Sequence, residues 1–293
     1  MPLLAPVTRA TVPASRRVVV MGGHGTGRYG RPFDDRTAPH AAVVGRTRVA
    51  RYGHPVAQTS YRQHRFRRPP GATEIFLVRH GESEPAVPGR PFPLVDGHGD
   101  PALAPEGCEQ AELVARRLAD EGLDAIYVTT LRRTVETAAP LAALTGLVPV
   151  VEADLREVFL GEWEGGLFRQ KVAAGDPVAA QLLEVGRWDV IPGAEPQEDL
   201  VVRTTEAVAR IAEAHPDQRV AVFSHGGIIG LVVALASGGE PFAFTGCDNG
   251  SITHLVVTED RWVVRRFNDT GHLPGGFDLT SVPEGPAGGG FSA

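Results

Sequence analysis

Two patterns of apolar and polar residues alternate along the chain from residue 71 onward. Short apolar runs predict buried β-strands over residues 74–79, 125–130, 148–153 and 220–224. Between them, apolar residues that recur every three or four positions predict helices over residues 106–120, 131–144, 204–215 and 226–236. Pro105 suits the start of the first helix and Gly146 the end of the second. Strands that alternate with helices indicate an α/β sheet domain.

The other segments have weaker patterns. Residues 163–200 are expected to be helical in pieces, and residues 251–258 and 261–267 predict a closing hairpin. We therefore expect one folded domain over residues 71–274. Residues 275–293 are rich in Gly and Pro and predict a disordered tail.

Residues 1–70 differ from the rest in charge. They contain 13 Arg and no Lys, with Asp34 and Asp35 as their acids, although the whole chain has a net charge of -6. They show no sustained periodicity, which predicts a disordered Arg-rich extension. A start codon placed too far upstream is the alternative hypothesis. Because few aromatic residues interleave with the arginines, we expect no nucleic acid partner.

The cysteines and the apolar runs of the sequence limit the cellular compartment that is expected for the protein. Cys108 and Cys247 do not have the spacing of metal ligands and do not indicate a disulfide framework. The longest apolar run, near residues 228–236, is far shorter than the roughly 20 residues of a membrane span, and residues 18–21 are too few for a secretory signal. A cytoplasmic protein without a membrane partner is therefore expected. The oligomeric state is undetermined by the sequence, and a homodimer is compatible with it.

Charged and polar residues follow several of the predicted strands. Ligands of open α/β sheets bind beyond the carboxyl ends of the strands, so these residues are expected to meet at one edge. They are Arg79, His80, Gly81 and Glu82; Thr129 to Arg133; Arg156 and Glu157; and Ser224, His225, Gly226 and Gly227.

This combination of residues suits the transfer of a phosphoryl group. Arginine forks match the oxygens of a phosphate and stay charged, and helix N-termini near Leu131 and Gly226 would direct N–H groups at the same anion. A neutral imidazole can act as the nucleophile, and a carboxylic acid can protonate the leaving oxygen.

Four motifs in order carry a family resemblance. Leu77-Val78-Arg79-His80-Gly81-Glu82 resembles the signature of the histidine phosphatase superfamily, also called phosphoglycerate mutase-like. The other motifs are similar to the family's arginine, glutamate and second histidine motifs: Thr130-Leu131-Arg132-Arg133 with Glu136-Thr137-Ala138, the segment from Leu155 to Gly165, and Ser224-His225-Gly226-Gly227. Residues 267–273 resemble a closing segment of its phosphatase members.

The resemblance implies a fold and a set of roles. The fold is a three-layer sandwich with a mostly parallel central sheet, helices on both faces and an antiparallel C-terminal hairpin. His80 would become phosphohistidine, and Glu157 would be the acid and base. Arg79, Arg133, His225 and Gly226 would bind the phosphate of a small-molecule phosphoester. The resemblance implies no metal and no organic cofactor.

Several residues have competing interpretations. Arg132 competes with Arg133 for the phosphate, and Glu162 and Glu164 compete with Glu157; motif spacing favours Arg133 and Glu157. Asp96, His98 and Asp100 resemble metal ligands, although a loop that is solvated or faces the substrate is preferred.

Three functions remain open at this stage, of which a phosphomonoester hydrolase is favoured. A phosphoglycerate mutase of the 2,3-bisphosphoglycerate-dependent type is the alternative, and a non-catalytic phosphate-binding or interaction protein is the third. Mutases place Asn, Tyr and paired arginines where this chain has Gly227, Leu160 and the lone Arg187, which favours the phosphatase. The sequence does not identify the substrate.

Overall fold

The computed structural model describes residues 61–275, and those from Gln63 onward form one compact unit. The extension predicted over residues 1–70 and the tail predicted over 275–293 lie almost wholly outside the described residues. Within the compact unit, residues 63–70 lie beside the sheet, where Arg68 donates a 2.7 Å hydrogen bond to the carbonyl of Asp217. No helix in the described part of the chain is long and apolar enough to cross a membrane.

A six-stranded mixed sheet forms the centre of the domain, in the order β5-β4-β6-β1-β7-β8. The parallel strands are β1 (Thr73–Arg79), β4 (Ala125–Val128), β5 (Val150–Val151) and β6 (Arg219–Ser224). The antiparallel pair β7 (Ile252–Val257) and β8 (Trp262–Asp269) adds to β1 at the other edge. The predicted fold class, including the C-terminal hairpin, is confirmed.

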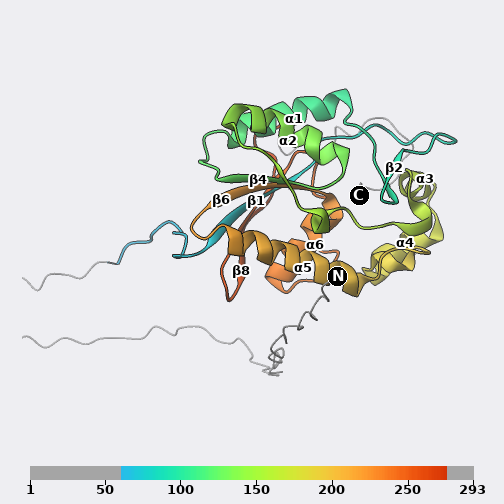
Figure 1. Cartoon of the computed structure of the whole chain (residues 1–293). Helices are drawn as coiled ribbons and strands as arrows, with labels where there is room; N and C mark the ends of the chain where they lie inside the picture. The colour runs from blue at the N-terminus through green and yellow to red at the C-terminus, as the bar shows by residue number, and fades with distance from the viewer. Residues whose placement is uncertain (1–60, 276–293) are drawn as a thin grey trace, which may run out of the picture. The chain divides into compact units, whose positions relative to one another are not determined.

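Helices cover both faces of this sheet (Figure 1). One face packs against α1 (Pro105–Leu118) and α2 (Arg132–Thr145), and the other against α5 (Gln197–Ala214) and α6 (Gly226–Ser237). Successive residues of β1 pack alternately into the two cores. Ile75 and Leu77 face α5 and α6, whereas Phe76 and Val78 face α1 and α2. A strand with both faces covered is an unbroken apolar run, which explains its sequence.

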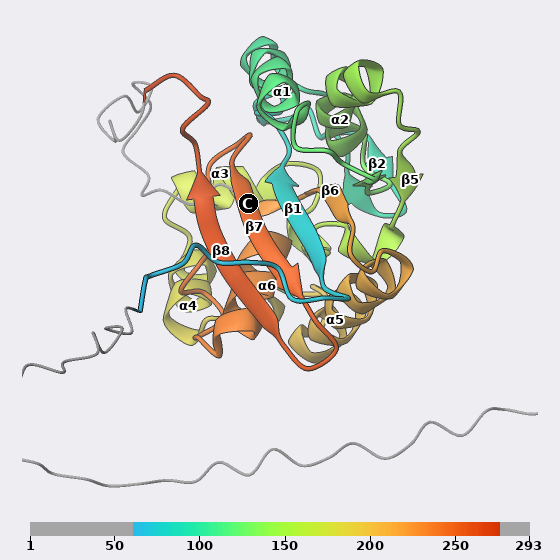
Figure 2. The same cartoon turned by 90° about the vertical axis from the view of Figure 1, so that its left-hand side faces the viewer.

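Smaller elements complete the chain. Helices α3 (Leu167–Ala173) and α4 (Pro177–Val185) form the pieces predicted between 163 and 200, together with three 3-10 turns, Ala153–Leu155, Gly161–Trp163 and Trp188–Val190. Figure 2 shows the β7–β8 hairpin facing the viewer, with the described N-terminal segment crossing it.

Two elements differ from the sequence prediction. Helix α5 begins at Gln197, seven positions before the predicted start, because Glu198 and Asp199 favour a helix N-terminus and Leu200 extends the buried face. A two-stranded ribbon, β2 (Leu94–Val95) and β3 (His98–Gly99), forms within the predicted loop. Asp96 and Gly97 have φ angles of 49° and 84° at its turn, as a tight hairpin requires.

The loop after β1 touches the first turn of α1 through glycine. A Cβ on Gly107 would lie 2.0 Å from the carbonyl oxygen of Glu82, and a Cβ on Gly81 would lie 2.4 Å from that of Gly107. Backbone therefore packs on backbone here, and neither position has room for a side chain.

Gly107→Ala tests this contact. Alanine favours a helix over glycine by about 1 kcal/mol, but the overlap with Glu82 should outweigh that gain and lower the free energy of unfolding by about 1–3 kcal/mol. Urea unfolding measures the change. The control is Glu109→Ala at an exposed position of the same helix, and a Gly107→Ala protein as stable as this control would contradict the prediction.

Candidate active site

The neighbouring strands β1 and β6 bring two histidines together. Arg79 pairs with Ser224 at the last register position, and the residues that directly follow the two strands are His80 and His225. The backbone N–H of His80 donates to the carbonyl of Ser224 at 3.0 Å. The two imidazole rings are 5.2 Å apart between centroids. Strand pairing thus fixes both rings at the carboxyl edge, as predicted from the sequence.

The hydrogen bonds of His80 define its tautomer. Its Nδ1 lies 2.7 Å from the carbonyl oxygen of Gly81, which can only accept, so Nδ1 carries the proton. The opposite nitrogen, Nε2, accepts a 3.2 Å hydrogen bond from Nε of Arg133. Burial, and then the positive charges of Arg133 and Arg79, lowers the pKa of His80 well below 6.5. The ring is therefore neutral at pH 7, with its lone pair on Nε2.

Arginines surround this lone pair. Arg133 is buried and donates from Nη1 to the carbonyl of Gly99 at 2.9 Å, and burial lowers its pKa to about 10, so it stays charged at neutral pH. Arg79 is buried as well and donates to the carbonyl of Cys247. Arg132, by contrast, is exposed and pairs with Glu136. Of the two adjacent arginines, Arg133 is the one at the site.

His225 lies at the start of α6, whose first residue is Gly226. Its Nε2 is 3.0 Å from the hydroxyl of Thr129, and its buried Nδ1 has no hydrogen-bond partner within the described residues. Burial, and then the charge of Arg133, lowers the pKa of His225 well below 6.5. A neutral ring that accepts from Thr129 through Nε2 has its N–H at Nδ1, available to an anion.

Glu157 is the buried glutamate of its segment. Its Oε2 accepts from the backbone N–H of Gly227 at 3.3 Å, and its Oε1 from that of Val158 at 3.0 Å. A Cβ on Gly227 would lie 2.6 Å from Oε1, so this glycine is what lets the carboxylate approach α6. Glu162 is exposed. Glu164 accepts from the backbone N–H groups of Leu160 and Gly99 at 2.9 and 2.7 Å, which makes it a structural brace.

The second motif positions the first. Thr137 accepts from the backbone N–H of Gly81 at 2.9 Å and donates to the carbonyl of Arg133 at 2.6 Å. Glu136 accepts from the N–H of Leu103 at 2.8 Å. The triplet Glu136-Thr137-Ala138 therefore joins the loop that carries His80 to the helix that carries Arg133.

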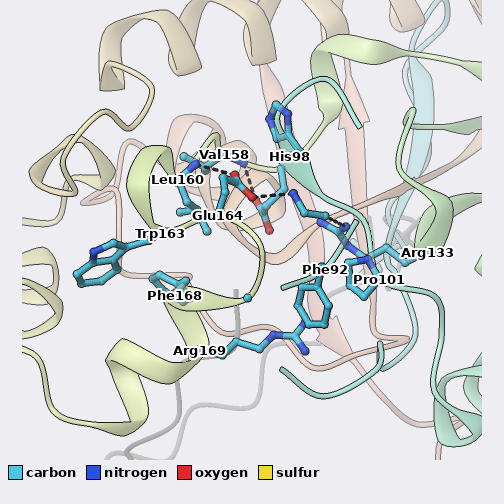
Figure 3. Close-up of a pocket in the computed structure, with 13 residues that line it drawn as sticks. Phe92, His98, Pro101, Arg133, Val158, Leu160, Trp163, Glu164, Phe168 and Arg169 are labelled. Atoms are coloured by element: carbon cyan, nitrogen blue, oxygen red, sulfur yellow. Dashed lines mark hydrogen bonds between the residues drawn. The ribbon is translucent and has the colours of Figure 1, made fainter. Parts of the chain in front are cut away.

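A pocket opens beside these residues and is lined by Arg133, Glu157 and strand β3 (Figure 3). Its aromatic wall contains Phe92, Trp163 and Phe168. Arg169 extends from α3 toward Phe92, with its guanidinium carbon 5.4 Å from the ring centroid, and donates to Ser83 Oγ at 2.7 Å. Burial, and then the charge of Arg79, lowers the pKa of Arg169.

Sequence reasoning missed Arg169 as a pocket residue. It stands on a short helix in the least regular part of the pattern, and its place depends on how residues 163–200 fold. Arg187, which sequence reasoning compared with the mutase arginines, instead pairs with Asp189 and Glu198 at 2.5 and 2.9 Å.

The three residues that resemble metal ligands have other partners. Asp96 pairs with Arg156 at 3.0 Å, Asp100 accepts from the N–H of Arg132 at 2.7 Å, and the ring of His98 packs edge-on against Phe159. Across residues 61–275, no group of three or more His, Cys, Asp or Glu side chains could hold a metal ion.

Known proteins share both the sequence and the fold. Residues 75–270 match the model of the histidine phosphatase superfamily, branch 1. The chain is 32% identical over 204 residues to phosphoglycerate mutase-like protein 4 of Arabidopsis thaliana, covering 68% of this chain and 86% of that protein. It is 30% identical over 224 residues to a metal-independent phosphoserine phosphatase of the same plant, covering 72% and 90% of the two chains.

A solved structure agrees with these sequence matches. The mycobacterial glucosyl-3-phosphoglycerate phosphatase superposes with a TM-score of 0.57 at 29% identity, covering 68% of this chain and 100% of that one. The same mycobacterial protein has been solved with inorganic phosphate and with VO3. The family match spans the sheet, the helices on both faces and every residue of the site above, and the chain therefore belongs to the histidine phosphatase superfamily.

Proposed function

We propose that this phosphatase hydrolyses the phosphomonoester of a small metabolite through a phosphohistidine at His80, without a metal ion. The observation that carries the proposal is the state of the His80 ring. Its Nδ1 proton is held by the carbonyl of Gly81, and its lone pair lies on Nε2 beside Arg133. A neutral nucleophile among guanidinium groups suits attack on a phosphate dianion, whose own charge would repel an anionic nucleophile.

The first step forms the bond between Nε2 of His80 and phosphorus while the ester P–O bond breaks. Glu157 gives its proton to the departing alkoxide oxygen, which leaves as an alcohol. Arg79, Arg133, the Nδ1–H of His225 and the N-terminus of α6 at Gly226 stabilise the charge on the three phosphoryl oxygens. In the second step Glu157, now a carboxylate, takes a proton from a water molecule while the oxygen of that water attacks phosphorus. The N–P bond breaks, and neutral His80 and inorganic phosphate result.

Features of the pocket support hydrolysis over isomerisation. A mutase must hold its phosphorylated intermediate while that molecule reorients in the pocket. Groups that bind the intermediate at the end away from the transferred phosphate would hold it. Leu160 and Gly227 offer no polar side chain at the two positions where mutases carry Tyr and Asn. The guanidinium of Arg187 forms ion pairs with the carboxylates of Asp189 and Glu198. Relatives are named for phosphoserine and for glucosyl-3-phosphoglycerate, which are phosphoesters with a carboxylate, and the positive charge of Arg169 in the pocket supports a substrate of this kind.

His80→Ala should remove phosphate release from para-nitrophenyl phosphate and from a panel of glycerate, serine and sugar phosphates, because no nucleophile is left. Release by the unmodified chain should persist in EDTA. The control is His64→Ala, which replaces an exposed histidine. Isomerisation of 3-phosphoglycerate without release of phosphate would instead establish the mutase.

Glu157→Gln should slow the hydrolysis of alkyl phosphates such as O-phosphoserine by about 10²–10⁴-fold, since a poor leaving group needs a proton. The loss should be smaller with para-nitrophenyl phosphate, whose phenolate leaves unaided. Steady-state kinetics with both substrates measures the difference. Glu162→Gln is the matched control, and equal losses with the two substrates would exclude Glu157 as the acid.

The free energy of unfolding should depend on pH through His80. Its pKa lies well below 6.5 in the folded state but near 6.5 once unfolded, so the unfolded chain binds more protons between these two values. Stability therefore falls as the pH falls below 6.5. His80→Asn should reduce this slope by up to about 1.4 kcal/mol per pH unit, measured by urea unfolding from pH 7.5 to 5.5. If His80→Asn and His64→Asn gave equal slopes, the His80 ring would be charged below pH 6.5 in the folded protein as well, and the prediction would be wrong.

A further inference from the structure

A second concentration of charge lies away from the catalytic edge. Six arginines line one hollow together with Phe66, Glu74 and His254; they are Arg65, Arg67, Arg68, Arg219, Arg265 and Arg266. Glu74 and Arg219 stand at the beginnings of β1 and β6. The catalytic residues follow the other ends of the same strands, so the hollow and the active site lie at opposite ends of the parallel strands.

A β-bulge places two of these arginines on one side of β8. His254 of β7 pairs with Arg266, and the next residue, Leu255, pairs with Val264, so Arg265 is an extra residue in β8. Neighbours in a regular strand point to opposite faces, and a bulge redirects a side chain. Arg265 and Arg266 both line the hollow as a result.

The segment before β1 supplies three more arginines. Figure 2 shows this segment crossing β8 and β7 on its way to β1. Phe66 lies under Arg265, with the guanidinium carbon 3.9 Å from the ring centroid. Arg68 fixes the end of the segment through Asp217 and a 3.4 Å pair with Glu74. Arg65 and Arg67 are exposed beside it.

Negative charge in the hollow is scarce. Of the nine lining residues Glu74 alone is acidic, and it is shared by Arg68, Arg219 and His254 at 3.4, 3.2 and 3.0 Å. Arg266 has a longer pair with Asp269, at 3.8 Å. Most of the positive charge is therefore unbalanced within the hollow, and like charges so close together repel one another.

We propose that this hollow binds a compact anion with two or three linked phosphoryl groups, either inorganic or carried by a nucleotide. Guanidinium forks match phosphoryl oxygens. One phosphoryl group carries about -1.5 to -2 charges at pH 7, so more than one is needed to balance the positive charge of the six arginines that Glu74 and Asp269 leave uncompensated.

The surroundings favour a compact ligand over an extended one. Residues 71–293 contain 33 of the 35 acidic residues but only 16 of the 29 Lys and Arg. A nucleic acid strand or an anionic membrane would extend beyond the hollow over this acidic surface, and its binding would be opposed there. A small anion stays within the roughly 8 Å over which the arginines act at physiological salt.

Tripolyphosphate is the probe, titrated calorimetrically into the full chain at fixed ionic strength. The test variant is R265Q/R266Q, and R67Q is a second variant whose side chain lies outside the sheet. The matched control R116Q/R261Q removes two exposed arginines elsewhere. Competitive inhibition of phosphate release by tripolyphosphate reports binding at the catalytic pocket separately.

We expect two bound anions per chain, with the affinity of one reduced at least tenfold in R265Q/R266Q, less in R67Q, and unchanged in the control. The inhibition constant at the catalytic pocket should be the same in all four proteins, and saturating tripolyphosphate should raise the melting temperature less in R265Q/R266Q than in the control. Tighter binding of ATP than of tripolyphosphate would assign the anion to a nucleotide, and the reverse order to an inorganic source. The proposal would be overturned by a single bound anion or by equal affinities in the test variant and the control. It would also be overturned if R265Q/R266Q lost binding to single-stranded DNA or phosphatidylserine vesicles but not to tripolyphosphate.

Discussion

The parallel pairing of β1 with β6 is the constraint on which the site depends. Both strands are buried on their two faces, and their register ends with Arg79 opposite Ser224. A histidine directly follows each strand, so any slip in the register would separate the two rings. A slip would also expose apolar side chains from both cores at once, which makes the register costly to change. The same burial that stabilises the sheet thereby fixes the geometry of the site.

The site concentrates positive charge where the protein itself supplies little to balance it. Arg79 and Arg133 are buried, Arg169 is close by, and burial and their charges keep His80 and His225 neutral. Glu157 and Glu164 are the carboxylates among the residues that line the same pocket, and Glu164 is engaged by the backbone N–H groups of Leu160 and Gly99. The proposed phosphate dianion would balance this positive charge, and the groups that would stabilise it are already in place in the fold.

Much of this could be predicted from the sequence, because the informative residues lie at the ends of strongly patterned strands. His80, Arg133 and His225 follow apolar runs whose burial leaves little choice of fold, and the edge at which they meet follows from strand direction. Arg169 and the start of α5 could not be predicted in the same way. Residues 163–200 fold as short helices whose positions depend on tertiary contacts with Trp163 and Phe168 rather than on local periodicity. The paired arginines of β8 depend on a bulge, which moves a side chain to the other face without any change in apolar pattern.

The loop between β1 and α1 is anchored at its two ends and touches the rest of the domain at single points between them, such as Phe92 and Asp96. Ser83 bridges to Leu103 beside the glycine contact, and Gly99 is held by Arg133 and Glu164. Residues 84–98 between these anchors supply Phe92 and His98 to the pocket and carry no strand of the main sheet. Insertions, deletions and substitutions in this stretch can therefore leave the main sheet and the residues at its carboxyl edge in place. Evolution can thereby change the contacts that Phe92 and His98 make in the pocket while Arg79, His80 and His225 keep their positions at the strand ends.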